Sequence, residues 1–322
     1  MTFYTYILPQ IFSVVKSGLK SIYLIFKKFD DIIFIYNERK VIEMNRKEKI
    51  MKRVQEHYDY LQSLGYEVVC VCLQGSQNYG LDEYSDEYQS DIDTKAIVLP
   101  PLDDFIAAAS PVSTVVIMDN NEHAEVKDIR VMFDMFKKAN ISYIELLFTE
   151  FKIINPEWEP YIRDLFDYRA RIAAYHRNQF LRCIAGMAME KRKALCHPYP
   201  NLIEKIEKYG YDGKQLHHCV RLHNFITRFL DGESLDTCYR VSAPMHGVLM
   251  NYKKQKDAYG EDLSVDRAIK ICDHYVAEIG KLKDAAVTDE EILDPEVKEL
   301  MSKILLKIMK AKMIKDLEVS YD

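Results

Sequence analysis

The sequence has little glycine and little proline, with 11 and 10 of these residues in a chain of 322. Collagen-like chains and low-complexity disordered chains are rich in one or both, so these classes are excluded. The chain also lacks an excess of positive charge, because 50 acidic residues outnumber 44 Lys and Arg. A protein that holds duplex nucleic acid by bulk electrostatics is normally basic. Any contact with nucleic acid must therefore come from a local patch.

Cysteine pairs with the spacing of a metal site or a disulfide framework are missing as well. The seven cysteines are an odd number, are scattered along the chain and include no CxxC pair. We interpret them as small packing residues. This usage favours a reducing, cytoplasmic setting.

A long apolar run is absent too. Residues 1–15 carry no charge, but Lys16 and Lys20 interrupt the run before it reaches the roughly 20 apolar residues of a spanning helix. A signal peptide would place its positive charge ahead of the apolar stretch. Apolar residues recur at helical spacing, so we expect residues 1–43 to form an amphipathic extension that packs on the body or on a partner. A helix on a membrane surface and an extension upstream of a true start at Met44 remain alternatives.

What is present indicates an α+β protein. A buried strand is predicted over residues 66–73 and a second over 92–99, with two more over 114–118 and 124–129 joined by a polar turn. After Pro156 strand-like runs disappear, and helical periodicity dominates. We therefore expect a small α+β domain over residues 44–155, followed by an all-helical C-terminal domain over 156–322. The predicted helices of the second part are 161–175, 178–195, 214–230, 265–282 and 295–317.

Acidic residues are concentrated in one stretch, residues 82–93. Six acids and no Lys or Arg lie there, and six equals the formal negative excess of the whole chain. Such a loop requires either solvent or cations. The acids are Asp82, Glu83, Asp86, Glu87, Asp91 and Asp93.

The residues that flank this loop predict a phosphate and metal site. Gly75 and Ser76 follow the first strand directly, and a turn from there into a helical segment would offer free N–H groups to an anion. Asp91 and Asp93 stand two residues apart at the head of the next strand, so both carboxylates share one face while Ile92 points into the core. Two carboxylates so close repel each other unless a cation lies between them, and Mg²⁺ suits such oxygen ligands.

A two-metal site needs a third acid on a neighbouring strand. Glu125, between the apolar residues Ala124 and Val126, meets that description. Asp128 is the competitor, but strand parity puts it on the other face if Glu125 is the ligand. We expect the three carboxylates to converge within reach of a bridging metal.

A second polar cluster lies in the helical half. Asp212 is a plausible N-cap. Lys214, His217 (or His218) and Arg221 then form one stripe of a helix. This stripe could close over a triphosphate opposite the acidic strand, contact an acceptor, or be a solvated or interdomain face. We interpret the basic run 191–193 as an exposed helix face rather than a phosphate contact.

The order of these features resembles the nucleotidyltransferase superfamily related to DNA polymerase β: Gly-Ser, then Asp-hydrophobic-Asp on a strand, then a lone acid on a later strand. Within it, residues 75–81, 90–95 and 209–214 resemble a bacterial and phage group of predicted nucleotidyltransferases. The likeness runs over residues 44–230. The 14 residues between Ser76 and Asp91 slightly exceed the usual spacing, and the first 43 residues match nothing in the family.

The resemblance implies a catalytic domain with a mixed sheet and flanking helices. It implies transfer of a nucleoside monophosphate from an NTP to an acceptor hydroxyl, with release of pyrophosphate. The acceptor could be an RNA or tRNA end, a protein or a small molecule. The resemblance assigns Mg²⁺ (or Mn²⁺) binding and catalysis to Asp91, Asp93 and Glu125, and NTP binding to Gly75, Ser76, Asn78, Tyr79, Lys214, His217 and Arg221. The alternative is a non-catalytic module that retains the fold to sense a nucleotide or to be regulated by a partner.

Overall fold

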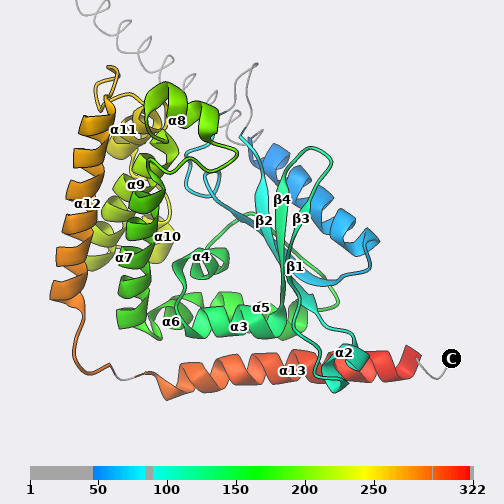
Figure 1. Ribbon diagram of the computed structural model, residues 1–322. Coiled ribbons are helices and arrows are strands. Elements are labelled where there is room, and N and C mark those ends of the chain that lie inside the picture. The colour runs from blue at the N-terminus through cyan, green and yellow to red at the C-terminus, as the bar shows by residue number, and fades with distance from the viewer. Residues whose placement is uncertain (1–45, 84–89, 292, 320–322) are drawn as a thin grey trace, which may run out of the picture. The chain divides into compact units, whose positions relative to one another are not determined.

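Figure 1 shows a computed structural model, which describes residues 46–83, 90–291 and 293–319. The predictions for the N-terminal extension and for the middle of the acidic loop lie outside the described residues. The chain divides into two compact units, residues 1–52 and residues 53–322. The strands β1 to β5 and the helices α2 to α13 all belong to the second unit.

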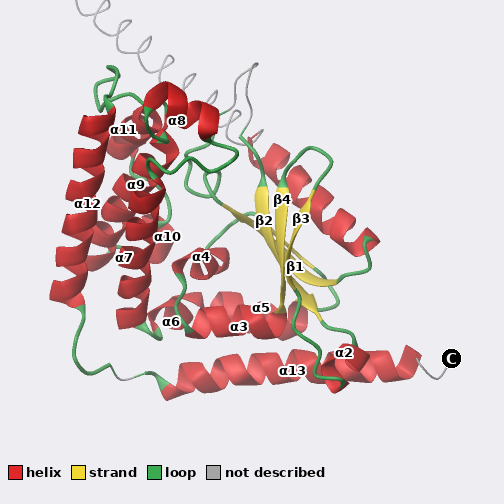
Figure 2. Ribbon diagram, viewed as in Figure 1, coloured by secondary structure: helices red, strands yellow, loops and turns green. Residues whose placement is uncertain are grey.

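A five-stranded mixed sheet organises the first half of this unit (Figure 2). The strand order is β3-β4-β2-β1-β5, in which β2 and β4 run parallel and every other neighbouring pair is antiparallel. The α+β class and the four predicted strands are confirmed to within one or two residues at each end. The strands are β1 (Glu67–Gln74), β2 (Asp93–Leu99), β3 (Ser113–Ile117), β4 (His123–Asp128) and β5 (Lys152–Ile154).

The parallel pair of β2 and β4 sets the geometry of the acidic residues. Lys95 lies opposite Glu125, and Thr94 lies opposite Ala124. Because side chains alternate along a strand, Asp93, Lys95 and Glu125 share one face. Thr94 points to the opposite face, where residues 53–63 of a helix over residues 46–63 pack on the sheet.

Helices make up the rest of the described unit, and every regular element described after β5 is helical. The helices are α2 (Leu102–Ile106), α3 (Ile129–Lys137), α4 (Ile141–Ile144), η1 (Glu145–Leu147), α5 (Glu159–Asp167), α6 (Arg169–Ala174), α7 (Arg177–Ala194), α8 (Ile203–Tyr209), α9 (Gly213–Leu230), α10 (Leu235–Cys238), α11 (Ala243–Lys253), α12 (Val265–Ala286) and α13 (Pro295–Val319).

Two groups of helices lie next to the sheet, one to its left and one along its lower end in the view of Figure 1. α7, α9 and α12 pack on one another, while α13 packs along α5 and α3 beside the sheet. One continuous core joins strand residues such as Val69 with Phe133 of α3 and Phe225 of α9. The predicted boundary at residue 155 stays a prediction, since residues 53–322 form one compact unit.

Some of these elements were not predicted. No sequence pattern predicts β5, α8, α10 or α11, and the helix expected over 161–175 is two helices, α5 and α6. α11 buries only Leu249 and Tyr252. Its sequence therefore has too few core-facing residues to show the apolar periodicity from which a helix is predicted. None of the described helices combines the length and the apolar character that crossing a membrane requires. All seven cysteines are free, as expected.

Candidate functional site

The chain from Gly75 to Gly80 is a series of turns at the end of β1. Gly75 has a φ of +86°, a left-handed conformation that glycine adopts without strain. The N–H of Asn78 donates to the carbonyl of Gly75 (3.0 Å), and the N–H of Leu81 donates to that of Ser76 (2.9 Å). The helical segment that was expected to follow Ser76 is absent. The chain forms turns there, and these end at Gly80, which has a φ of +72°. No helix N-terminus offers its N–H groups here.

The buried carboxylate of Glu145 forms hydrogen bonds to this turn. Glu145 of η1 accepts hydrogen bonds from the N–H of Gly75 and from the hydroxyl of Tyr79. The guanidinium carbon of Arg221 lies 3.8 Å from the centre of the Tyr79 ring. Burial raises the pKa of Glu145, although the Tyr79 hydroxyl and the charges of Arg221 and Lys95 oppose that shift.

These contacts remove three predicted nucleotide-binding residues from the cavity described below. Tyr79 and Arg221 are buried against each other. The side-chain oxygen of Asn78 accepts a hydrogen bond from the Thr149 hydroxyl (2.7 Å). None of Asn78, Tyr79 and Arg221 lines the cavity.

Asp91 and Asp93 lie together with Gly75 and Ser76 at the wall of the cavity. Ile92 between them is buried, as the alternation predicted. The amide of Gln77 donates to the carbonyls of Ser90 (2.8 Å) and Asp91 (3.2 Å), which fixes the approach to the strand. A Cβ atom on Gly75 would lie 3.9 Å from Oδ2 of Asp93, so this carboxylate lies near the turn.

The two carboxylates are available to a ligand. The carboxylate of Asp91 forms no hydrogen bond or ion pair with any described residue. His123 Nδ1 lies 3.5 Å from Asp93 Oδ1, and about half of the His123 side chain is exposed. Two accessible carboxylates beside a cavity suit Mg²⁺, which is usually bound by one or two carboxylates together with substrate phosphates.

Glu125 occupies the predicted face of β4 but has other partners. Its carboxylate contacts the ammonium of Lys95 and that of Lys127 (3.0 Å), and accepts a hydrogen bond from the Tyr143 hydroxyl (2.9 Å). Burial alone would raise the pKa of Glu125, but these partners outweigh it and lower the pKa to about 2. The carboxylate is thus already neutralised by two lysines.

The predicted convergence of three carboxylates is not found. Among the described residues, no group of three or more His, Cys, Asp or Glu side chains is placed to hold a metal ion. Glu125 is instead paired with Lys95 and Lys127. Asp128 is no substitute, because it is buried on the other face, caps α3 at the N–H of Arg130 (2.8 Å) and pairs with the Arg130 guanidinium (2.6 Å).

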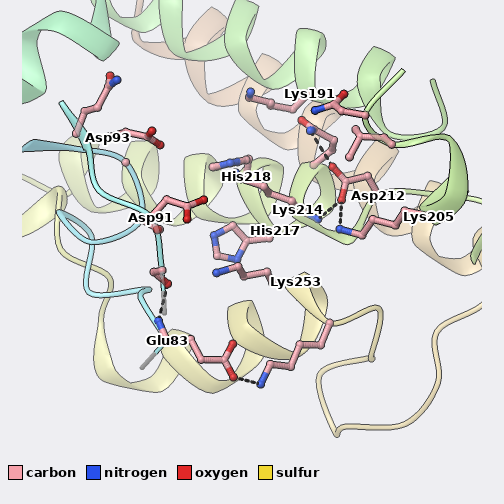
Figure 3. A pocket seen from close by; sticks show the side chains of 18 residues that line it. Glu83, Asp91, Asp93, Lys191, Lys205, Asp212, Lys214, His217, His218 and Lys253 are labelled. Atoms are coloured by element: carbon pink, nitrogen blue, oxygen red, sulfur yellow. Dashed lines mark hydrogen bonds and ion pairs between the residues drawn. The ribbon is translucent and has the colours of Figure 1, made fainter. Parts of the chain in front are cut away.

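The opposite wall of the cavity is basic (Figure 3). Asp212 caps α9 by accepting from the N–H of Lys214 (3.0 Å), as the sequence predicted. Lys214 and both candidate histidines, His217 and His218, then line the cavity. Lys191 at the end of α7 and Lys253 at the end of α11 join them.

The three lysines of this wall, Lys191, Lys214 and Lys253, are not held in ion pairs within the part of the chain that the structure describes. Asp212 nevertheless lies near Lys191, and Asp82 and Glu83 lie near Lys253. Burial lowers the pKa of Lys191 and of Lys253, and the charge of Lys214 lowers each further. A basic wall whose charges repel one another favours an anion with several charges.

The histidines add no positive charge near neutral pH. Nδ1 of His217 donates to the carbonyl of Leu249 (2.9 Å), which leaves Nε2 without a proton in the neutral ring. Burial lowers the pKa of His217 to about 4, and burial together with the neighbouring His217 and Arg221 lowers that of His218 well below its usual value.

The cavity between the two walls has a volume of about 710 Å³. This lies in the range of small-molecule sites. Sequence reasoning missed two parts of its basic wall. Lys191 was interpreted as exposed, although only its neighbours Arg192 and Lys193 pair with surface acids. Lys253 was not singled out, and no sequence pattern identifies it.

No family model matches the chain, and no curated protein matches it. Among solved structures, it is similar to a nucleotidyltransferase-like protein from Exiguobacterium sibiricum 255-15. The two share 12% sequence identity with a TM-score of 0.31, over 82% of this chain and 91% of the other.

Proposed function

We propose that the protein is a metal-dependent nucleotidyltransferase that moves a nucleoside monophosphate from an NTP to an acceptor hydroxyl. One observation carries the proposal. A single cavity has two accessible carboxylates beside a Gly-Ser turn on one wall and three lysines without ion pairs on the other. A nucleoside triphosphate with its divalent cation has the complementary charges.

Each wall has its own task in this reaction. Asp91 and Asp93 would hold Mg²⁺ or Mn²⁺, which when bound neutralises charge on the triphosphate and orients it for in-line attack. Ser76 donates its hydroxyl to a phosphate oxygen. Lys191 and Lys214 attract the outer phosphates and stabilise the charge that develops on the departing pyrophosphate. His217, neutral near pH 7, leaves that charge to the lysines.

The position of Glu125 favours a second candidate. A carboxylate held by two lysines does not take a proton or bind a second metal unless Lys95 moves away. A module that binds a nucleotide without transferring it would need no third acid. The non-catalytic alternative therefore rests on the ion pairs of Glu125 with Lys95 and Lys127. The role of Glu125 as the third acid remains a prediction.

One labelling experiment separates the candidates. The full chain is incubated with Mg²⁺, each α-labelled NTP in turn, and RNA or protein from cells as acceptor. We expect label in one acceptor class, and a loss of more than about a hundredfold in Asp93→Asn, since even residues that only orient metal ligands cost 10–100-fold. Lys193→Met is the control, because Lys193 is exposed and pairs with Glu190 (2.8 Å).

The outcomes are distinct. Labelling by Asp93→Asn at the wild-type rate would contradict the proposed chemistry. Binding of an NTP by the wild-type chain without transfer to any acceptor would favour the non-catalytic module.

A further inference from the structure

The chain between the two cavity carboxylates is anchored from the face of the sheet that lies away from the cavity. The N–H of Ile92 donates to Oε1 of Glu122 across 2.8 Å. Glu122 directly precedes β4 and is buried, with 4% of its surface exposed. It does not line the cavity. A carboxylate in this place fixes the backbone at the one residue that separates Asp91 from Asp93.

The second oxygen of Glu122 is fully used. Oε2 accepts from the guanidinium of Arg53 (2.6 Å) and from Nε2 of His57 (3.0 Å). Because Nε2 of His57 faces a carboxylate, it carries a proton, and Nδ1 lies at hydrogen-bond distance from the Thr94 hydroxyl (2.9 Å).

Glu122 and His57 therefore form hydrogen bonds to the residues on both sides of Asp93. Glu122 holds the backbone of the residue before it, and His57 holds the side chain of the residue after it. Both contacts are buried, where a hydrogen bond to a charged group is worth more than in water. Arg53 compensates the charge of Glu122, so the buried carboxylate is paired rather than isolated.

We propose that Glu122, together with His57, is a positioning residue that sets the spacing of Asp91 and Asp93 for a divalent cation. This inference rests on the proposed function. A cation that is held by two carboxylates is sensitive to their separation, because each ligand must reach it at a fixed oxygen distance. Residues that orient metal ligands from behind typically contribute 10–100-fold to metal affinity.

Glu122→Gln tests this role with little change of shape. The amide oxygen can still accept from the N–H of Ile92, but the amide NH₂ group then meets the donors of Arg53 and His57. His57 can change its tautomer and accept from this NH₂ group, but the guanidinium of Arg53 has no acceptor atom and faces an unpaired donor, so the residue shifts and the strand loses its anchor.

The measurement is Mn²⁺ binding to the full chain, followed by electron paramagnetic resonance, without nucleotide. We expect the dissociation constant to rise about tenfold or more in Glu122→Gln. In Asp93→Asn binding at this site should be lost. Circular dichroism and thermal unfolding verify that each variant is folded.

Asp128→Asn is the matched control. Asp128 lies at the other end of β4 and is also buried, and it too accepts from a backbone N–H and pairs with an arginine. Its loss weakens the fold in a comparable way, yet it anchors α3 and not the strand of Asp93. We expect its Mn²⁺ affinity to equal that of the wild type.

A folded Glu122→Gln chain with wild-type Mn²⁺ affinity would overturn the positioning role. So would an equal loss of affinity in Asp128→Asn, since the effect would then be one of stability. If Glu122→Gln does not fold, Thr94→Val decides, because it removes only the hydroxyl that His57 contacts. A weaker Mn²⁺ affinity in that variant supports the role, and an unchanged one overturns it.

Failure of the proposed function would look different. Mn²⁺ affinity that is unchanged in Asp93→Asn would remove the metal site itself, and the positioning role with it. Mn²⁺ binding that depends on both Asp93 and Glu122, without any nucleotidyl transfer, would leave the positioning role intact and contradict only the enzymatic proposal.

Discussion

His217 shows how its surroundings change what a single side chain contributes. A histidine in water titrates near neutral pH. His217 is buried, and Arg221, Lys253 and Lys214 add positive charge around it, so its pKa falls to about 4. The carbonyl of Leu249 accepts its Nδ1 proton and favours the charged ring, but not enough to offset burial.

A dependence of stability on pH follows from this shift. Between pH 6.5, the usual pKa of histidine, and about pH 4, the unfolded chain binds a proton at His217 and the folded chain does not. Stability is therefore complete above pH 6.5 and falls on acidification, by up to about 3 kcal/mol for this residue. Urea unfolding at pH 7 and pH 4.5 measures the fall, and His217→Gln should show a smaller one.

His218 titrates in the same direction, so the comparison uses the difference between the wild-type chain and the variant. Equal losses of stability in both would contradict the assigned pKa. They would show that the imidazole of His217 is accessible to water.

The site residues that could be predicted are those whose chemistry depends on local sequence. Asp91 and Asp93 flank the buried Ile92 and both line the cavity, although β2 begins only at Asp93, and Lys214 and His217 share a face of α9 because helices repeat. The same periodicity was misleading for Arg221. It lies two turns further along α9, where the helix has passed the cavity and packs against Tyr79.

At the scale of elements, the cavity depends on how closely two helices approach. A Cβ atom on Gly213, the first residue of α9, would lie 2.3 Å from the carbonyl oxygen of Tyr252 and 3.0 Å from that of Lys253. Only a glycine allows the end of α11 to come this near. The close approach places Lys253 beside the start of α9, where the sequence of neither helix predicts it.

Two glycine substitutions test this contact. Gly213→Ala forces the helix ends apart, so we expect the free energy of unfolding to fall by about 1–3 kcal/mol. Gly186→Ala, in the middle of α7, is the matched control because no atom lies within 4 Å of its added Cβ. Alanine is the better helix former there, and stability should rise by up to about 1 kcal/mol. Urea unfolding of both variants checks the pair.

A destabilised Gly186→Ala chain, or a Gly213→Ala chain as stable as the wild type, would contradict the packing described here. The first result would mean that another group packs against α7 at Gly186. The second would show that α9 and α11 can separate without cost.

The elements themselves were predictable in proportion to the strength of their patterns. β1 and β2 combine β-branched residues with a sharp end, and α9 has a cap and an apolar stripe. β5 has three residues and pairs only with β1, so it depends on tertiary contacts that no local pattern encodes. The helix predicted after Gly75 does not form, because the backbone at Gly80 is left-handed. A glycine is the only sequence sign of that conformation, and a single glycine does not predict it.

At the scale of the whole unit, the cavity joins parts of the chain that are far apart in sequence. One wall comes from the end of β1 and the start of β2, and the other from α7, α9 and α11. Burial is the main reason that the pKa values of Lys191 and Lys253 are lowered, and the charge of Lys214 lowers both further, so the lysines of the second wall repel one another in the free protein. A bound polyanion removes that repulsion and links the two walls, so it should stabilise the unit as a whole.

Thermal unfolding with and without Mg²⁺-ATP measures this link. At a ligand concentration of 100 times the dissociation constant, binding adds about 2.7 kcal/mol to stability, which raises the melting temperature by several degrees. Lys191→Met keeps the apolar length of the side chain but removes its charge. Without ligand its melting temperature should equal or exceed that of the wild type, since one repelling charge is gone, and with ligand the increase should be smaller.

Lys191→Met should thus leave the melting temperature unchanged or raise it without ligand, and reduce the increase that Mg²⁺-ATP causes. A lysine with only a structural role would not produce this combination. A lysine that only stabilised the fold would lower the melting temperature in both conditions. Lys193→Met, two residues along α7, removes an exposed charge that pairs with Glu190 and does not line the cavity. We expect it to match the wild type in its response to Mg²⁺-ATP. If Lys191→Met instead keeps the full ligand response, the basic wall does not bind the triphosphate, and the phosphates would have to lie elsewhere.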